Sequence, residues 1–205
     1  MATTADVARI ARKVCKAFAD GATGLTIGHT HFEMADVGYC SEFARECCEA
    51  ALQALPHTLP YFGADARKTE ARLIAADTKV ATPQPGDIVC FNTVSGGTYG
   101  HIGIHLDRDY FAENTSSKAR GPGFVTSTYE EMGLSRVTGY YHLPELEKEE
   151  PYVDVDKWAD ADVVWAKQAR IMSGDPDGKF RGRDPVTRQE LAAVAHRIVL
   201  LVKGE

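Results

Sequence analysis

Residues 100–106 read Gly-His-Ile-Gly-Ile-His-Leu, so large apolar side chains alternate with small or polar ones. Apolar residues at every second position predict a β-strand that places one face in the core. The same period turns His101, Gly103 and His105 to the opposite face. We expect His101 to open the strand beside a cleft, and Gly103 to leave room there for the backbone of a substrate.

The segments around this strand predict helices first and strands afterwards. Apolar residues at helical spacing predict helices over residues 5–19, from Cys40 or Ser41 to 55, and over 64–78. Short apolar or alternating runs predict further strands at 88–91, 110–115 and 137–143. This order predicts an α+β domain in which helices pack on an antiparallel sheet.

Length and composition limit the classes of protein to consider. The chain has 205 residues, of which 44% are hydrophobic and 25% charged, and this excludes a disordered or fibrous protein. Its formal charge of −6 argues against electrostatic binding of nucleic acid. The longest apolar run, Ile198 to Val202, is too short to cross a bilayer, and the first residues lack the pattern of a secretory signal. We expect neither nucleic acid nor membrane as a partner.

A change in composition divides the chain near residues 144–152. Two prolines flank a mostly acidic run there, which is typical of a linker. From Pro151 onward nine acidic and nine basic residues balance, so the first part carries the whole net charge of −6. We predict one domain at residues 1–147 and a small helical module at 152–205, with helices over 163–171 and 187–202.

The five cysteines are odd in number and are not spaced as a disulfide framework, so we expect free thiols. Cys15, Cys47 and Cys48 are interpreted as small buried hydrophobic residues. Cys40 differs, because it stands where a loop ends and a helix begins. The amides and dipole of a helix N-terminus favour a thiolate there, and the same amides could bind an oxyanion.

His101 is the predicted partner of Cys40, as the base of a nucleophile–base pair. A third polar group should hold the imidazole in its productive tautomer. The strand at 110–115 offers Glu113 and Asn114. Adjacent strand residues face opposite ways, so at most one of them reaches His101 directly, and the sequence leaves both open. A carboxylate would also stabilise an imidazolium, which favours Glu113.

Metal sites are weakly indicated. His29, His31 and Cys40 are ligand types that suit zinc, but their spacing fits no familiar site. A calcium-binding loop that begins at Asp175 would need glycine at its sixth position and glutamate at its twelfth, where Phe180 and Val186 stand. We predict a turn in that segment, and no cofactor or metal for the chain.

The motifs of the first part resemble a known group of enzymes. Residues 39–44, Tyr-Cys-Ser-Glu-Phe-Ala, with Pro-Gly-Asp-Ile-Val at 85–89 and the strand at 100–106, resemble the NlpC-type and CHAP-type cell-wall hydrolases. The resemblance covers about residues 5–143 and implies a papain-like α+β fold and cleavage of amide bonds in peptidoglycan. It implies Cys40 as the nucleophile, His101 as the base and Glu113 as the third residue.

This sequence also departs from those families. Tyr39 precedes the cysteine and Glu42 follows Ser41, where the usual motif is Asp-Cys-Ser-Gly. Glu113 is closer to CHAP-type usage than to NlpC-type usage. The subfamily therefore stays open, and with it the bond that is cut: the muramoyl–L-alanine amide, or a bond within the stem or cross-bridge.

The tail resembles an S-layer homology module over about residues 153–203. The resemblance is carried by Trp-Ala-Lys at 165–167, the segment 171–181, and Asp-Pro-Val-Thr-Arg-Gln-Glu-Leu-Ala at 184–192. It implies binding of an anionic secondary wall polymer, for which Arg188 and Trp165 are the candidate contacts. A single copy suggests either weak binding by this tail alone or assembly of several chains through it. Thr187 and Glu190 have the spacing of a capping box.

Together these features predict a peptidoglycan hydrolase with a wall-binding tail. We expect a phage endolysin, which stays in the host cytoplasm until the membrane is permeabilised and then acts on the cell wall. Two alternatives remain: a bacterial wall-remodelling peptidase or amidase toxin, and a non-catalytic wall-binding protein.

Overall fold

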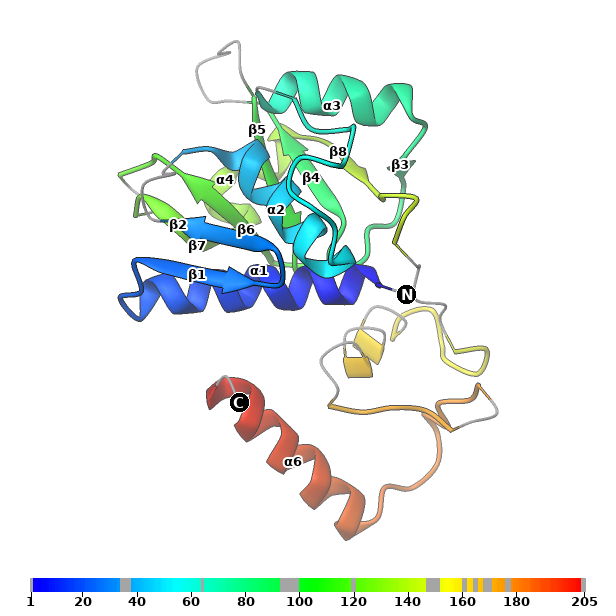
Figure 1. Cartoon of the computed structure of the whole chain (residues 1–205). Helices are drawn as coiled ribbons and strands as arrows, with labels where there is room; N and C mark the ends of the chain where they lie inside the picture. Colours follow the sequence, from blue (N-terminus) through cyan, green and yellow to red (C-terminus); the bar gives the residue numbers. More distant parts are fainter. Residues whose placement is uncertain are drawn as a thin grey trace. The chain divides into compact units, whose positions relative to one another are not determined.

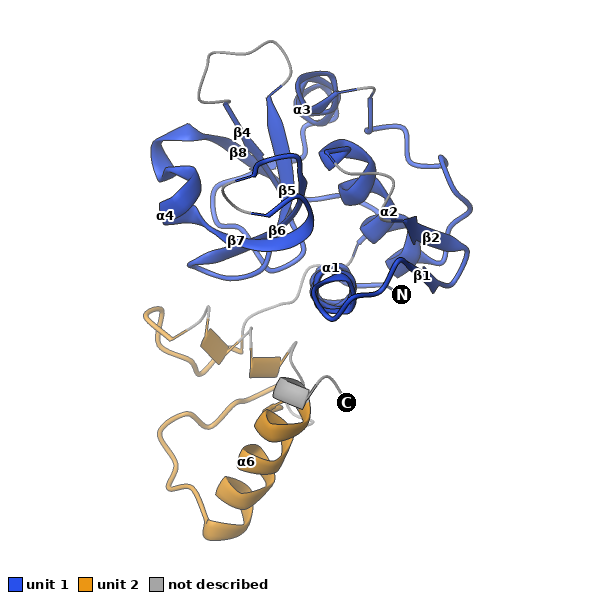
Figure 2. Cartoon of the chain, turned by 90° about the vertical axis from the view of Figure 1, so that its left-hand side faces the viewer, with its two compact units in different colours: residues 1–148 blue, residues 149–205 orange. Residues whose placement is uncertain are grey.

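The computed structural model describes residues 2–33, 38–63, 65–92, 100–118, 121–146, 152–159, 162–163, 166–167, 171–175 and 178–203. The chain divides into two compact units, Met1–Lys148 and Glu149–Glu205 (Figure 1, Figure 2). We call them unit 1 and unit 2 and describe each by itself. The division falls within the residues predicted as a linker.

Three helices of unit 1 match the predicted ones, with small differences at their ends. They are α1 (Thr4–Ala19), α2 (Cys40–Leu52) and α3 (Ala66–Ala75). Helix α1 begins with a capping box, in which Thr3 and Asp6 satisfy each other's backbone amides. Helix α2 ends before residue 55 because Gln53 adopts a left-handed conformation, with φ of 52°.

Six strands form one antiparallel sheet in the order β3-β8-β4-β5-β6-β7. Their bounds are Lys79–Val80 for β3, Ile88–Phe91 for β4, His101–His105 for β5, Tyr110–Thr115 for β6, Gly123–Thr128 for β7 and Val137–Tyr141 for β8. Helices α1 and α2 pack on this sheet (Figure 1). The predicted α+β class, with helices on an antiparallel sheet, is confirmed.

Several short elements were not predicted from the sequence. A hairpin of β1 (Gly24–Ile27) and β2 (Thr30–Glu33) precedes α2. Strand β7, which reads Gly-Phe-Val-Thr-Ser-Thr, pairs with β6 over its full length. After it come the single-turn helix α4 (Tyr129–Met132) and the 3-10 turn η2 (Leu134–Arg136). These segments carry too few apolar residues to show a clear period.

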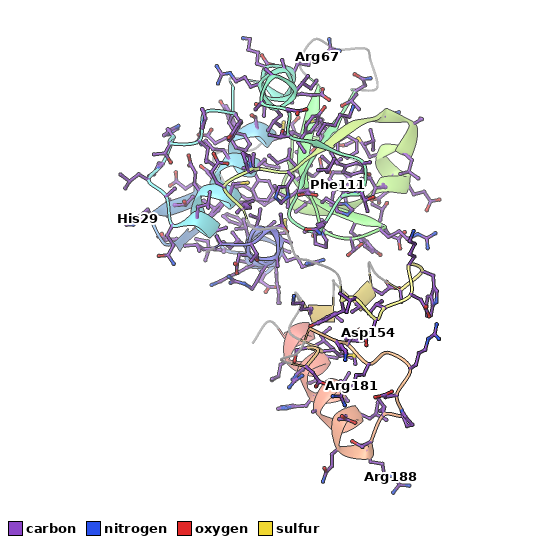
Figure 3. The ribbon with its side chains drawn as sticks, turned by 90° about the vertical axis from the view of Figure 1, so that its right-hand side faces the viewer. His29, Arg67, Phe111, Asp154, Arg181 and Arg188 are labelled. Carbon is purple, nitrogen blue, oxygen red and sulfur yellow. The ribbon has the colours of Figure 1, made fainter. Side chains whose placement is uncertain are left out.

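Both faces of the central strands are buried, and this corrects one prediction. The face opposite the helices packs a second apolar cluster of Val89, Phe91, Phe111, Tyr129 and Met132. A Cβ atom on Gly103 would lie 2.6 Å from the carbonyl oxygen of Ala112 and 2.8 Å from Cδ2 of Phe111. The expected space for a substrate backbone at Gly103 is therefore wrong, because Phe111 fills it. Figure 3 shows Phe111 inside unit 1.

In its described part, unit 2 has one long helix, α6 (Arg188–Lys203), which matches the helix predicted over 187–202. The predicted capping box is present, since Thr187 and Glu190 hydrogen-bond in both directions. The helix predicted over 163–171 lies mostly outside the described residues, although residues 162–163 and 166–167 are helical. No helix within the described part of the chain is long and apolar enough to cross a membrane.

Unit 2 is held together by contacts between distant segments. The carboxylate of Asp154 accepts hydrogen bonds from the backbone amides of Phe180 and Arg181, both at 2.8 Å. Figure 3 shows Asp154 and Arg181 on adjacent parts of this unit. The ring of Phe180 also packs on that of Tyr152, with centroids 5.5 Å apart. These contacts tie the start of unit 2 to the loop that leads into α6.

Candidate functional site

Cys40 is the first residue of α2, and the thiol is partly exposed. The chain enters the helix through Gly38, which has φ of +89°, and the N-cap residue Tyr39. Among the described residues, Tyr39 makes no side-chain capping hydrogen bond. Because the first amides of a helix have no partner within it, they are available to an anion beside Cys40.

His101 is the first residue of β5, and Glu113 lies on the neighbouring strand β6. His105 pairs with Phe111 across these strands, so the period of two puts Glu113 on the same face as His101. The Nε2 atom of His101 lies 2.5 Å from Oε2 of Glu113, whose side chain is completely buried.

Cys40 lies close enough to the ring of His101 to raise the pKa of the imidazole. Burial lowers the pKa of His101, but hydrogen bonds and charge interactions with Cys40 and Glu113 have the opposite and larger combined effect. Together they raise the pKa of His101 from 6.5 to about 9. The imidazole is thus protonated at neutral pH. The structure brings Cys40, His101 and Glu113 together from three different elements.

Asn114, the alternative third residue, is placed differently. Its Oδ1 atom accepts a hydrogen bond of 2.9 Å from the backbone amide of Gly38. Asn114 therefore holds the turn that precedes Cys40, whereas Glu113 contacts the imidazole. Both residues serve the same site from opposite faces of one strand.

A pocket of about 640 Å³ opens at this point of unit 1. It is lined by Cys40 and His101 and by polar groups from several loops and strand ends, among them Asn92, Asn114, Ser116 and Ser117. Glu42, Arg45 and Asp65 supply its charged side chains. Arg45 forms an ion pair of 2.7 Å with Glu42. The pocket thus joins the thiol, the imidazole and a polar surface large enough for part of a peptide.

The other cysteines are buried, as predicted for Cys15, Cys47 and Cys48. Burial raises the pKa of the Cys15 thiol to about 12, and it also raises the pKa values of Cys47, Cys48 and Cys90 well above the ordinary value. These four thiols stay protonated and unreactive at neutral pH. Cys40 is therefore the cysteine placed for a reaction.

Sequence reasoning missed two groups of hydroxyl residues around the site. Ser127 on β7 donates a hydrogen bond to Oε1 of Glu113. Behind Cys40, the hydroxyls of Ser41 and Thr69 lie 2.6 Å apart, and that of Thr69 accepts a hydrogen bond from the amide of Gly63. Ser41 belongs to the motif at 39–44, but Thr69 and Ser127 belong to no recognisable motif. The only available signal for Ser127 was its place on a strand beside β6, and that strand was not predicted.

Within the described residues, no group of three or more His, Cys, Asp or Glu side chains could hold a metal ion. His29 lies at the outer edge of unit 1 (Figure 3), and Nδ1 of His31 is 2.8 Å from the hydroxyl of Thr26. In unit 2, the amide of Gly178 donates to the carbonyl of Asp175 at 3.1 Å, and the residues between them, where a turn is predicted, lie outside the described residues. Asp175 also pairs with Arg181 at 2.5 Å.

The predicted polymer contacts of unit 2 are only partly described. Arg188 is exposed at the start of α6, and its side chain points away from the helix (Figure 3). Trp165 lies outside the described residues. Trp158, which precedes Trp165 in the chain, has a side chain that is 82% exposed.

Comparison with protein families gives one result. Residues 151–192 match the S-layer homology domain. A search of curated proteins gives no match for the chain. The chain thus carries an S-layer homology domain, a module that binds cell-wall polymers and associates with the cell surface. No comparison identifies unit 1 as NlpC-type or CHAP-type, so that resemblance rests on its residues alone.

Proposed function

We propose that unit 1 is a papain-like cysteine amidohydrolase that cleaves an amide bond of peptidoglycan, and that the S-layer homology domain attaches it to the wall. The observation that carries the proposal is the arrangement of three groups. Cys40 opens a helix with its thiol against the ring of His101, and Nε2 of that ring contacts the buried carboxylate of Glu113. This is the order of groups that nucleophilic acyl transfer requires.

The first step of the proposed reaction forms a thioester. The thiolate of Cys40, which has given its proton to His101, attacks the carbonyl carbon of the scissile amide. The first amides of α2 stabilise the resulting oxyanion. The C–N bond then breaks as the imidazolium of His101 donates its proton to the leaving amine. The acyl group remains on the sulfur of Cys40.

The second step regenerates the thiol. His101, now neutral, accepts a proton from a water molecule that attacks the thioester carbon. Collapse of the tetrahedral intermediate breaks the C–S bond and releases a carboxylic acid. Glu113 touches neither the substrate nor the water. It holds the ring of His101 and stabilises its positive charge in both steps.

The choice of peptidoglycan as substrate is supported by two independent features. The S-layer homology domain brings the chain to the cell wall. The motif at 39–44 and the Pro-Gly-Asp segment resemble wall hydrolases. The bond is either the muramoyl–L-alanine amide or one within the stem or cross-bridge, and mass spectrometry of the released fragments distinguishes these products.

The test uses the full chain and purified cell walls, with release of soluble fragments as the measurement. We expect the wild type to release fragments and Cys40→Ala to release none, because no other described thiol is placed to replace the nucleophile. Cys48→Ala is the matched control, since it removes a buried thiol from the same helix. We expect it to retain activity. Unchanged release by Cys40→Ala would exclude this mechanism.

A second candidate function is a non-catalytic wall-binding protein, and the identified S-layer homology domain favours it. In that case neither the wild type nor Cys40→Ala would release fragments, while both would sediment with walls.

The role as a phage endolysin stays a prediction of the sequence. Lysis of cells from within, dependent on a co-expressed holin, would test it.

A further inference from the structure

The carboxylate of Glu113 has a partner on each of its two oxygens. Oε2 lies 2.5 Å from Nε2 of His101, and Oε1 accepts a hydrogen bond from the hydroxyl of Ser127. Glu113 is completely buried, and Ser127 is 2% exposed. A buried carboxylate is costly unless hydrogen bonds replace its hydration, so both contacts matter for its ionised form.

We infer that Ser127 is a positioning residue of the candidate site, whose hydroxyl fixes the carboxylate of Glu113 in the orientation that holds His101 towards Cys40. The inference rests on the proposed function and extends the set of three groups to a fourth. Ser127 does not line the pocket, so it acts only through Glu113.

The pairing of the strands explains why Ser127 can reach Glu113. Phe111 is paired with Ser127 across β6 and β7, and Glu113 with Val125. Phe111 and Glu113 share a face, so the side chain of Ser127 lies diagonal to that of Glu113 on this face. His101 contacts the other side of the same carboxylate from β5. The carboxylate is thus held between two neighbouring strands.

A thiol is a further titratable group near this carboxylate. Cys15, on α1, interacts with Glu113, but burial raises the pKa of its thiol to about 12, so it remains neutral. The imidazole of His101 faces only two such groups in the described contacts, Cys40 from α2 and Glu113 from β6. A change in the titration of His101 would therefore report on the Glu113 carboxylate or on Cys40.

The consequence of losing the Ser127 hydroxyl follows from these contacts. Without the hydrogen bond from Ser127 to Oε1, the carboxylate of Glu113 is less firmly oriented, and its contact with Nε2 of His101 weakens. The imidazolium is then less favoured, and the ring turns away from the thiol more often. Because the pocket is unchanged, we expect kcat to fall and KM to stay.

The test compares three full-length variants. Ser127→Ala removes the hydroxyl, and Ser127→Thr keeps it. Thr78→Val is the control, since Thr78 is also buried and its hydroxyl donates to the carbonyl of Leu73 at 2.9 Å, outside the pocket lining. For each variant we would measure the titration midpoint of the His101 ring by NMR, and kcat and KM on wall fragments.

We expect Ser127→Ala to lower the titration midpoint of the His101 ring by about one pH unit and to lower kcat about tenfold. Both sizes follow from the usual strength of a hydrogen bond to a charged group. Ser127→Thr should restore both, and Thr78→Val should leave both unchanged. A wild-type midpoint in Ser127→Ala overturns the inference, whatever its activity. Because the midpoint is measured without turnover, an absence of hydrolysis in the wild type would refute the proposed function and leave the role of Ser127 decidable.

Discussion

The charge on His101 depends on opposing effects at one residue. Burial disfavours the imidazolium, whereas Cys40 and Glu113 favour it and prevail, so that the pKa rises to about 9. A cationic ring beside a thiol can form an ion pair with the thiolate, which is the reactive form of a cysteine nucleophile. Glu113 is therefore expected to influence both catalysis and folding stability.

Replacing Glu113 by Gln tests that influence on stability. The folded-state pKa of His101, about 9, exceeds its ordinary value of 6.5, so protonated His101 stabilises the fold fully below pH 6.5. This stabilisation is lost as the pH rises to about 9. We expect the free energy of unfolding of the wild type to fall by about 3 kcal/mol at most across this range, and that of Glu113→Gln to fall less.

Urea unfolding at about pH 6 and about pH 10 measures this difference. Glu130→Gln, which removes an exposed carboxylate from α4, is the control and should behave as the wild type does. An identical pH dependence in Glu113→Gln would mean that the carboxylate does not support the imidazolium.

At the residue level, the sequence indicated that Cys40 and His101 lie together, but it did not decide which polar residue contacts the ring of His101. Cys40 and His101 followed from a helix start and a strand start. The choice between Glu113 and Asn114 required the register of β5 against β6, which depends on how the whole sheet pairs. Predicting the contact of Ser127 would also have required the register of β7 against β6. Registers of this kind are set by long-range packing and leave little trace in local composition.

At the level of elements, β5 shows why alternation alone was misleading. The pattern of residues 101–106 predicted one buried face and one open face. In the structure all of β5 after His101 is buried, because Phe111 and Tyr129 cover the second face. His105 is buried there, with Nδ1 2.6 Å from the hydroxyl of Tyr129, and burial lowers its pKa to about 4.

Gly103→Ala tests this packing. The added Cβ would meet the carbonyl of Ala112 and the ring of Phe111 at less than 3 Å, so the strands must shift. We expect the variant to lose about 1–3 kcal/mol of unfolding free energy, as overpacked cores do. Chemical denaturation measures the loss. If Gly103 instead faced a substrate, the variant would keep its stability and show a raised KM.

Helices were predicted correctly where a capping motif and the spacing of the apolar residues indicated the same start. Helix α1 carries both a capping box and an uninterrupted apolar face, and its predicted and observed ends differ by one residue at the start. The hairpin β1–β2 was missed because each of its strands has only four residues, and β7 was missed because Gly, Thr and Ser dominate its sequence. Their stability comes from pairing and from packing on α1 and α2, not from local preference.

At the level of the whole molecule, the two units offer separate functions in one chain. Unit 1 has its own core and contains all of the candidate catalytic residues. Unit 2 carries the S-layer homology domain. The charge balance along the sequence already indicated this division, since the net charge resides in the first part.

A fragment of residues 1–150 tests whether the functions separate. We expect it to cleave soluble wall fragments at the rate of the full chain, because the candidate site lies wholly in unit 1. We expect it to lose most sedimentation with intact walls, since the polymer-binding domain is gone. Sedimentation and fragment release would be measured on the same preparations. Equal sedimentation of the fragment and the full chain would contradict a binding role for the tail.

The burial of β5 on both sides also bears on how the proposed enzyme could change its specificity. Beyond its first residue the strand has no side chain that a ligand could touch, so mutations there would damage the scaffold before they altered selectivity. New preferences would have to arise in the turns that surround the thiol, near Gly38, Gly63 and Ser116. Evolution or design could therefore diversify these turns while the strand beneath them stays constant.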